Sequence, residues 1–223
     1  YSLLEHPVIS TKITVPRLPE GSVRRPRLTE RVSRGVEGPL TLLMAPAGFG
    51  KTNVLVQWAN ETDLARAWLT IDSEDNDPRR LFRHLISALQ TLEPGLGEEA
   101  LEFILSTRGG GLEIGLTLLI NEVSALSRDL ILILDEFQSL HDHVVLQGIE
   151  FLIKHLPDNL HLVIASRTTL PFSLAALRVR SRVCELGAGD LRFTEDEIAS
   201  FFLQTSALQL SADTVRTIEI RTD

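Results

Sequence analysis

A stretch of small residues that ends in a lysine and a threonine follows an apolar segment and precedes a helical pattern. The stretch, called the phosphate loop below, reads Ala45-Pro46-Ala47-Gly48-Phe49-Gly50-Lys51-Thr52-Asn53. In such a loop the backbone N–H groups point inward and the helix N-terminus adds positive potential, which suits a polyphosphate. Gly48 and Gly50 permit the tight turn. We expect Lys51 to reach the β- and γ-phosphates of a nucleotide and the Thr52 hydroxyl to bind Mg²⁺.

One position departs from the usual spacing of these loops. Ala45 stands where the pattern has its first glycine. A small residue still fits there, but the departure leaves an alternative open. In that alternative, Gly-Lys-Thr occurs by chance at a strand-to-helix turn.

A second group of residues supports the phosphate-binding interpretation. The apolar run Leu130–Leu134 is followed directly by Asp135 and Glu136. At the end of a buried strand, Asp135 can hold Mg²⁺ through water while Thr52 holds it directly. Glu136 is placed to orient or deprotonate an attacking water, which favours a water-activating ATPase over a phosphotransferase. A solvated strand end is the alternative interpretation of the two acids.

A cation ends another apolar run, Leu162-Val163-Ile164-Ala165-Ser166-Arg167. In a phosphate-binding sheet this strand can lie between the strand that leads into the loop and the strand that ends in Asp135. Arg167 would then face the γ-phosphate and sense it through bidentate hydrogen bonds. An exposed arginine in a loop is the alternative.

Two polar clusters resemble metal sites but lack the rest of the pattern. His141-Asp142-His143 has no companion Cys or His group. The acids at positions 72, 74, 75 and 77 lack the glycine and the final glutamate of a calcium loop. A capped loop that enters a helix, with Asp77 as the cap and Pro78 at the first helical position, explains these acids better.

The composition of the 223-residue chain limits the possible functions. A hydrophobic content of 43% is enough for one substantial core. The net charge of −8 argues against nucleic-acid binding by the chain as a whole. The single cysteine, Cys184, excludes an internal disulfide and fits a reducing compartment. No run approaches the roughly 20 apolar residues of a membrane helix, and no signal-peptide pattern follows Tyr1. We therefore expect a cytoplasmic piece of a longer protein, without membrane contact.

The first segment is locally basic. It carries Arg17, Arg24, Arg25, Arg27, Arg31 and Arg34. A solvated arm, a nucleotide-facing segment and a DNA-contacting arm all remain open for it.

Alternating strand and helix patterns predict an α/β fold with a parallel sheet. The expected strands cover residues 40–44, 67–71, 130–134, 160–165 and 183–186. Helical patterns cover residues 52–60, a segment from Pro78 to about Leu92, and residues 98–106, 112–126, 144–155 and 173–179. Thr194-Glu195-Asp196-Glu197 is a capping box that opens a helix through Gln204, and Ser211 caps a second one. We assign residues 1–35 to an N-terminal segment, 36–190 to the core and 191–223 to the beginning of a helical lid domain.

Taken together, these landmarks resemble those of one known family. The sequence resembles the ATPase module of the large ATP-dependent LuxR-type transcriptional regulators, from about Thr11 to its end. These proteins are STAND-class ATPases, related to NB-ARC domains. Besides the phosphate loop, the matching segments are Val23-Arg24-Arg25-Pro26-Arg27-Leu28, Gln57-Trp58-Ala59, Ala67-Trp68-Leu69, Leu134-Asp135-Glu136, Ala165-Ser166-Arg167, Leu177-Arg178-Val179-Arg180 and Leu191-Arg192-Phe193-Thr194.

The resemblance implies details that spacing alone does not. It implies a P-loop NTPase fold, a three-layer α/β/α arrangement with a five-stranded sheet in the order 5-1-4-3-2. Val23, Arg24 and Arg25 would cover the adenine of ATP or ADP, and Arg167 would be the sensor arginine. The family accepts a small residue at the Ala45 position. Asn53 replaces a common threonine, which leaves a side-chain contact to the α-phosphate open.

The resemblance also implies a function and partners. ADP would hold a resting monomer, while a small-molecule inducer together with ATP would permit self-association. DNA binding would use a C-terminal helix-turn-helix, and both it and the inducer site would lie in domains outside this chain. The expected function is a switch domain that binds ATP or ADP and hydrolyses ATP slowly. A P-loop small-molecule kinase and a nucleotide-binding module without turnover are the alternatives.

Overall fold

The computed structural model describes residues 7–106, 111–179 and 182–206. Five parallel strands form one sheet in the order β2-β3-β4-β1-β5. The strands are β1 (Leu40–Met44), β2 (Arg66–Thr70), β3 (Leu130–Asp135), β4 (Leu160–Ser166) and β5 (Val183–Gly187). The expected strands and the order 5-1-4-3-2, read from the opposite edge, are confirmed.

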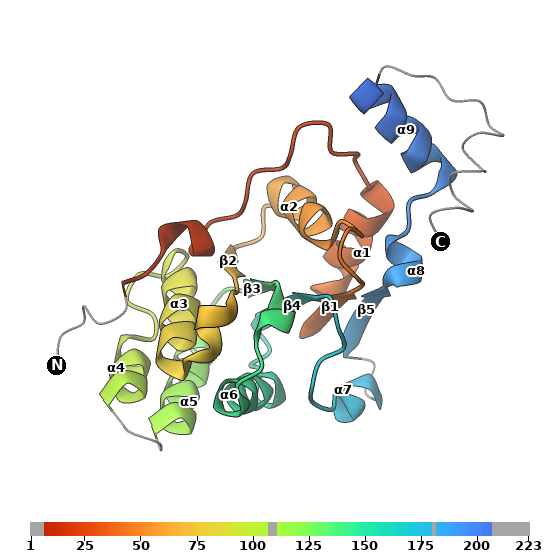
Figure 1. Cartoon of the computed structure of the whole chain (residues 1–223). Helices are drawn as coiled ribbons and strands as arrows, with labels where there is room; N and C mark the ends of the chain where they lie inside the picture. Colours follow the sequence, from red (N-terminus) through yellow and green to blue (C-terminus); the bar gives the residue numbers. More distant parts are fainter. Residues whose placement is uncertain (1–6, 107–110, 180–181, 207–223) are drawn as a thin grey trace.

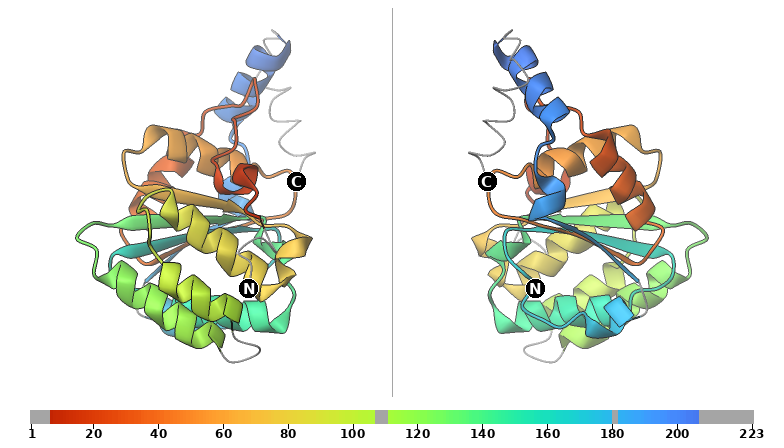
Figure 2. Two further views of the ribbon diagram at one scale, coloured as in Figure 1. Left: turned by 90° about the vertical axis from the view of Figure 1, so that its left-hand side faces the viewer. Right: turned by 90° about the vertical axis from the view of Figure 1, so that its right-hand side faces the viewer.

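Helices cover both faces of the sheet, which confirms the three-layer arrangement (Figures 1 and 2). One face carries α1 (Pro26–Gly35) and α2 (Lys51–Glu61). The other carries α3 (Pro78–Gln90), α4 (Glu98–Ser106), α5 (Gly111–Ser124) and α6 (His143–Lys154). The remaining helices are α7 (Ala175–Val179), α8 (Ala188–Leu191) and α9 (Glu195–Ser206), with short 3-10 turns η1 (Ser10–Ile13), η2 (Ser73–Asn76) and η3 (Phe137–Ser139).

Two apolar cores lie on opposite faces of the sheet because successive strand residues point to opposite sides. In β3, Leu132 and Leu134 belong to the core under α3–α6, while Ile131 and Ile133 belong to the core under α1 and α2. All six residues of β3 are buried. A continuous apolar run is therefore what this central strand requires, and that is the pattern that predicted it.

Both predicted helix caps are present. Asp77 accepts hydrogen bonds from the backbone N–H groups of Arg79 and Arg80 at the start of α3. At α9 the Thr194 hydroxyl accepts from the Glu197 N–H at 3.3 Å, and the Glu197 carboxylate accepts from the Thr194 N–H at 3.1 Å. The predicted second tail helix, with its cap at Ser211, falls outside the described residues.

The basic first segment is only in part a solvated arm, since Arg17, Arg24 and Arg34 are exposed but the other three arginines are not. Residues 26–35 form α1, whose Leu28 and Val32 are fully buried. Arg25 is buried, Arg27 and Arg31 are half-buried, and all three have acidic partners at positions 190 and 197. Those partners lie more than 150 residues away in the sequence, so local composition could not reveal them. The rest, residues 7–25, forms an N-terminal strap that runs from η1 beside α3, across the molecule, to α1 (Figure 1).

A buried cluster of charged residues anchors the beginning of the strap. The Lys12 ammonium donates to the Asp75 carboxylate and also lies 3.0 Å from Asp72. His84 Nδ1 lies 3.1 Å from Asp75 Oδ1, and the Ile9 N–H donates to His84 Nε2 at 3.4 Å. Burial raises the pKa of Asp75, but hydrogen bonds from His84 and Lys12 outweigh it, so the pKa lies below its usual value. Asp75 is therefore charged at neutral pH and pairs with Lys12 inside the protein.

We predict that Asp75→Asn lowers the free energy of unfolding by about 3–5 kcal/mol, because it removes the buried anion that pairs with the Lys12 ammonium and leaves it only the half-exposed Asp72. The pairing stabilises fully above the pKa of the unfolded carboxyl, ~3.9, and its contribution is lost as the pH falls through the lower folded value. Urea unfolding at pH 7 and at descending pH measures both effects. Glu93→Gln is the control: it breaks an exposed ion pair with Arg128, worth at most about 1 kcal/mol. Equal losses in the two variants would contradict the prediction.

Candidate functional site

The phosphate loop connects the end of β1 to the start of α2. Gly48 and Gly50 have φ angles of +87° and +74°, and Gly50 is the residue that precedes the first turn of α2. A Cβ added at Gly48 would meet no atom within 4 Å. The backbone conformation, rather than crowding, therefore requires glycine there. Pro46, Ala47 and Gly48 form the exposed crest of the loop, while Phe49 and Asn53 are half-buried.

Lys51 lies beneath this crest with only 6% of its surface exposed. Its ammonium donates to the carbonyl oxygens of Ala45 at 2.6 Å and Pro46 at 3.0 Å. Burial lowers the pKa of Lys51, and the nearby negative charge of Glu136 opposes that shift. A lysine held by two carbonyls keeps a third N–H to donate to an anionic oxygen.

Thr52 and Asp135 bring a hydroxyl and a carboxylate together. The Thr52 hydroxyl donates to Asp135 Oδ2 at 2.8 Å, and the Glu136 N–H donates to Oδ1 at 2.9 Å. Asp135 ends β3 and is 2% exposed. Burial raises the pKa of this carboxyl, and hydrogen bonds from Thr52 and the Glu136 backbone oppose the rise. Oxygen donors around a buried carboxylate that lacks a full countercharge suit a hard cation such as Mg²⁺, so this pair fits the metal that the family implies.

Glu136 and Arg167 form an ion pair next to this group. Arg167 Nη2 lies 2.7 Å from Glu136 Oε2. Gln138 in η3 joins both residues: its amide donates to Glu136 Oε2 at 2.6 Å, and its Oε1 accepts from the Arg167 N–H at 2.9 Å. Among the described residues, Glu136 is the only non-glycine with a positive φ, +59°. Sequence reasoning missed Gln138, because a single polar residue in a short turn carries no pattern of its own.

The sheet order explains why these side chains meet. β4, which precedes Arg167, lies between β1 and β3 as expected from the sequence. The carboxyl ends of the three parallel strands share one edge, where open α/β sheets bind their ligands. The charges of Glu136, Arg167 and Asp135 all act on Lys51. The structure thus brings Lys51, Thr52, Asp135, Glu136 and Arg167 into one group.

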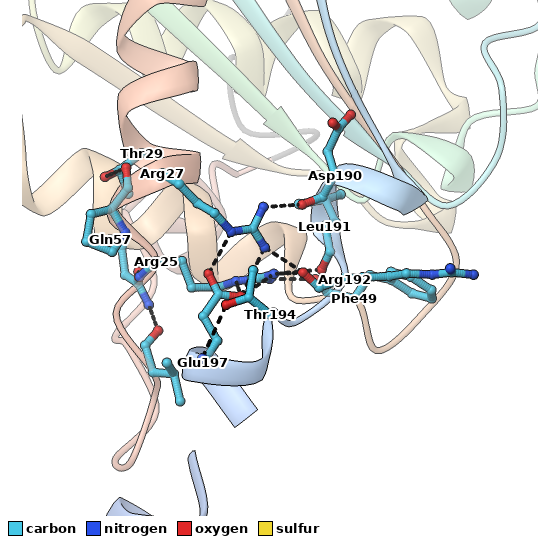
Figure 3. Close-up of polar contacts among 12 residues, drawn as sticks. Arg25, Arg27, Thr29, Phe49, Gln57, Asp190, Leu191, Arg192, Thr194 and Glu197 are labelled. Atoms are coloured by element: carbon cyan, nitrogen blue, oxygen red, sulfur yellow. Dashed lines mark hydrogen bonds and ion pairs between the residues drawn. The ribbon is translucent and has the colours of Figure 1, made fainter. Parts of the chain in front are cut away.

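The segment Val23–Arg25 lies beside α2. Gln57 fastens it there: its amide donates to the Val23 carbonyl at 2.6 Å, and its Oε1 accepts from the Arg25 N–H at 3.0 Å. Val23 is buried, and Arg24 is exposed with its guanidinium 4.0 Å from Glu61. The Arg25 guanidinium turns toward residues 191–197 and lies 3.4 Å from the Phe49 carbonyl (Figure 3). Gln57 is a further residue whose positioning role the sequence did not reveal.

The discounted metal cluster has structural roles. Asp142 caps α6 by accepting from the Val144 and Val145 N–H groups, and His141 contacts the Ser139 carbonyl. Across the described residues no group of three or more His, Cys, Asp or Glu could hold a metal ion.

In the same part of the chain no helix has the length and apolar character needed to span a membrane.

Comparisons with known proteins agree with this geometry. Residues 36–178 match the family model described as AAA domain. The chain is 33% identical over 196 residues to the HTH-type transcriptional regulator MalT of Serratia proteamaculans, and 32% identical over 197 residues to that of Vibrio cholerae. These matches cover 87% and 88% of the chain but 22% of each relative, so the chain spans about a fifth of their length.

A solved structure supports the fold. A Walker-type ATPase of Pyrococcus abyssi superposes with a TM-score of 0.53 at 15% identity, covering 92% of this chain and 65% of that one. Such identity shows the fold alone. The family match rests on the sequence, and the phosphate loop with the acid pair at the end of β3 gives it a physical basis. The chain belongs to the AAA domain family, and it is a P-loop ATPase domain homologous to MalT regulators.

Proposed function

We propose that this domain is a nucleotide switch, which binds ATP or ADP with Mg²⁺ and hydrolyses ATP slowly. Lys51 and the loop N–H groups would hold the phosphates, and Thr52 and Asp135 would hold the metal, which supplies positive charge to the phosphate oxygens. Val23, Arg24 and Arg25 would cover the adenine side. The backbone of Pro46 to Asn53 would surround the phosphates, although Asn53 offers an amide where a hydroxyl is common.

The observation that carries the switch proposal is the ion pair between Glu136 and Arg167. Arg167 and the Gln138 amide both donate to Oε2 of Glu136, so these two donors occupy the oxygen that an attacking water would have to reach. A γ-phosphate that draws Arg167 away would free Glu136 to take a proton from water. Hydrolysis would then require a rearrangement of the pair, which accounts for slow turnover. ADP has no γ-phosphate and would leave the pair intact.

The larger context is proposed from the relatives. In a regulator of the length of the MalT proteins, we infer that this domain responds to nucleotide in the cytoplasm. Inducer binding, stable self-association and DNA contact through a helix-turn-helix would belong to other parts. The net charge of −8 supports leaving DNA contact elsewhere.

Lys51→Ala is predicted to abolish measurable ATP and ADP binding while the protein stays folded. Removing a buried cation that holds only loop carbonyls costs little stability, whereas the phosphates lose their closest charge. Titration with a fluorescent ATP analogue measures the affinity, and circular dichroism checks the fold. Lys154→Ala, which removes an exposed lysine paired with Glu150, should bind like the parent. Parental affinity in folded Lys51→Ala would refute the assignment of the loop.

The two acids should fail differently. Asp135→Asn removes charge next to Thr52 and should weaken binding only when Mg²⁺ is present. Glu136→Gln should keep ATP bound but slow phosphate release by about 10²-fold or more, since general base catalysis contributes that much. Nucleotide titrations with and without Mg²⁺, together with single-turnover phosphate release, separate these outcomes. Parental hydrolysis by Glu136→Gln would exclude water activation by this residue.

Arg167→Ala is predicted to weaken binding of a non-hydrolysable ATP analogue more than binding of ADP. A charge-assisted contact to the γ-phosphate is worth roughly 1.5–3 kcal/mol, or about ten- to more than a hundredfold in affinity. Calorimetry with both nucleotides measures the difference. Arg128→Ala, which loses an exposed ion pair with Glu93, is the matched control. Equal losses for ATP and ADP would remove Arg167 from the sensor role.

A further inference from the structure

Three parts of the chain meet at the guanidinium of Arg25 (Figure 3). Arg25 itself ends the N-terminal strap. Its Nε and Nη2 lie 3.1 and 3.0 Å from the carboxylate of Glu197 in α9. Nη2 also donates to the carbonyls of Leu191 at 2.8 Å and Arg192 at 2.7 Å, just before α9. Nη1 donates to the Phe49 carbonyl of the phosphate loop at 3.4 Å. One side chain therefore bonds the strap, the phosphate loop and the start of α9 together.

Because Arg25 is buried, breaking its contact with Glu197 while it stays in place would be energetically unfavourable. Arg25 is 3% exposed, and the side chain of Glu197 is 9% exposed. The guanidinium carbon also lies 4.4 Å above the centre of the Phe193 ring. A buried arginine that loses its carboxylate leaves an uncompensated charge, which is strongly unfavourable. If α9 moves and carries Glu197 with it, Arg25 must therefore move as well.

Arg27 provides a natural comparison, because it bonds the same carboxylate without reaching the loop. Its Nε lies 2.9 Å from Glu197 Oε1, and its other nitrogens donate to the carbonyls of Asp190 and Arg192 at 2.6 and 2.5 Å. Arg27 is half-buried, with 38% of its side chain exposed. The two arginines thus fasten α9 in similar ways, but the contact with Phe49 is made by Arg25.

We propose that Arg25 is a positioning residue that couples the phosphate loop to α9 through Glu197. With Glu197 in place, the guanidinium is held against the Phe49 carbonyl and beside Gly50, where an added Cβ would lie 3.7 Å from Nη1. When α9 moves, Arg25 leaves the loop, and the loop loses a donor that fixes its shape. The affinity of the loop for a nucleotide therefore depends on the position of α9. This inference rests on the proposed nucleotide binding, and it concerns regulation of that same site.

Coupling of this kind acts in both directions. If the docked position of α9 favours the nucleotide-binding shape of the loop, then a bound nucleotide favours the docked position of α9. Amide hydrogen exchange in α9 should slow when ADP is added. The same measurement on residues 45–53 without nucleotide reports the loop directly, so the coupling is observable whether or not a nucleotide binds.

The experiment compares Arg25→Gln, Glu197→Gln, the double variant and the control Arg27→Gln. Glutamine at position 197 keeps an acceptor for the Thr194 N–H, so the capping box survives. We expect Arg25→Gln and Glu197→Gln each to weaken binding of a fluorescent ADP analogue about tenfold, within the range typical of coupled sites. The double variant should be no weaker than the weaker single variant. Arg27→Gln should change the affinity less than about twofold.

Hydrogen exchange completes the test. Arg25→Gln and Glu197→Gln should both speed exchange in residues 45–53, and Arg27→Gln should not. If Glu197→Gln fails to fold in urea titrations, Glu197→Asp replaces it with a shorter carboxylate. Parental or tighter nucleotide binding in Glu197→Gln, losses that multiply in the double variant, or an equal loss in Arg27→Gln would overturn the coupling. If the parent binds no nucleotide, the proposed function fails, while the exchange comparison still decides the coupling.

Discussion

Because β4 lies between β1 and β3, two strand spacings, roughly 10 Å, separate the strand that leads into the phosphate loop from the strand that ends in Asp135. A side chain at either strand end is too short to cross that gap alone. The phosphate loop carries Thr52, in the first turn of α2, across this gap, and the Thr52 hydroxyl donates a hydrogen bond to Asp135 at 2.8 Å. The loop must turn so that α2 begins beside this gap, and the left-handed conformations of Gly48 and Gly50 produce that turn. The rest of the site depends on this placement.

The charged residues Lys51, Asp135 and Glu136 each have hydrogen-bond partners within the protein. The Lys51 ammonium donates to loop carbonyls, the Asp135 carboxylate accepts from a hydroxyl and a backbone N–H, and the half-buried Glu136 accepts from Arg167 and Gln138. In the proposed function, a phosphate oxygen, a metal or a water would compete with these partners. A site whose polar groups satisfy one another changes state only when a ligand offers better bonds than the protein does. That property supports the proposed switch role, in which the domain responds to which nucleotide is bound.

The elements that could be predicted are those with a local signal. A run such as Leu130–Leu134 needs burial on both faces, and Asp77 followed by Pro78 is a local signal for the start of a helix. The sheet order came from family resemblance, because no local pattern encodes it. Long-range pairs had no such signal: Lys12 and Asp75 are 63 residues apart, and Arg25 and Glu197 are 172 apart. Helix α1 was not predicted, although Pro26 at its first position and the apolar Leu28 and Val32 on one face are a helical signal.

The separation between Arg25 and Glu197 also bears on how the chain is made. During synthesis the strands from β1 to β5, residues 40–187, emerge before Glu197 does. The sheet can therefore assemble from the N-terminal side while Arg25 still lacks its carboxylate. A guanidinium in that situation stays in water, and its contact with Glu197 can form only after residue 197 has left the ribosome. This contact joins residues 172 positions apart, and contacts between residues so distant in sequence carry a high entropic cost of loop closure. If Arg25 couples α9 to the loop as proposed, the loop reaches its final order only once the chain that follows the core has been made.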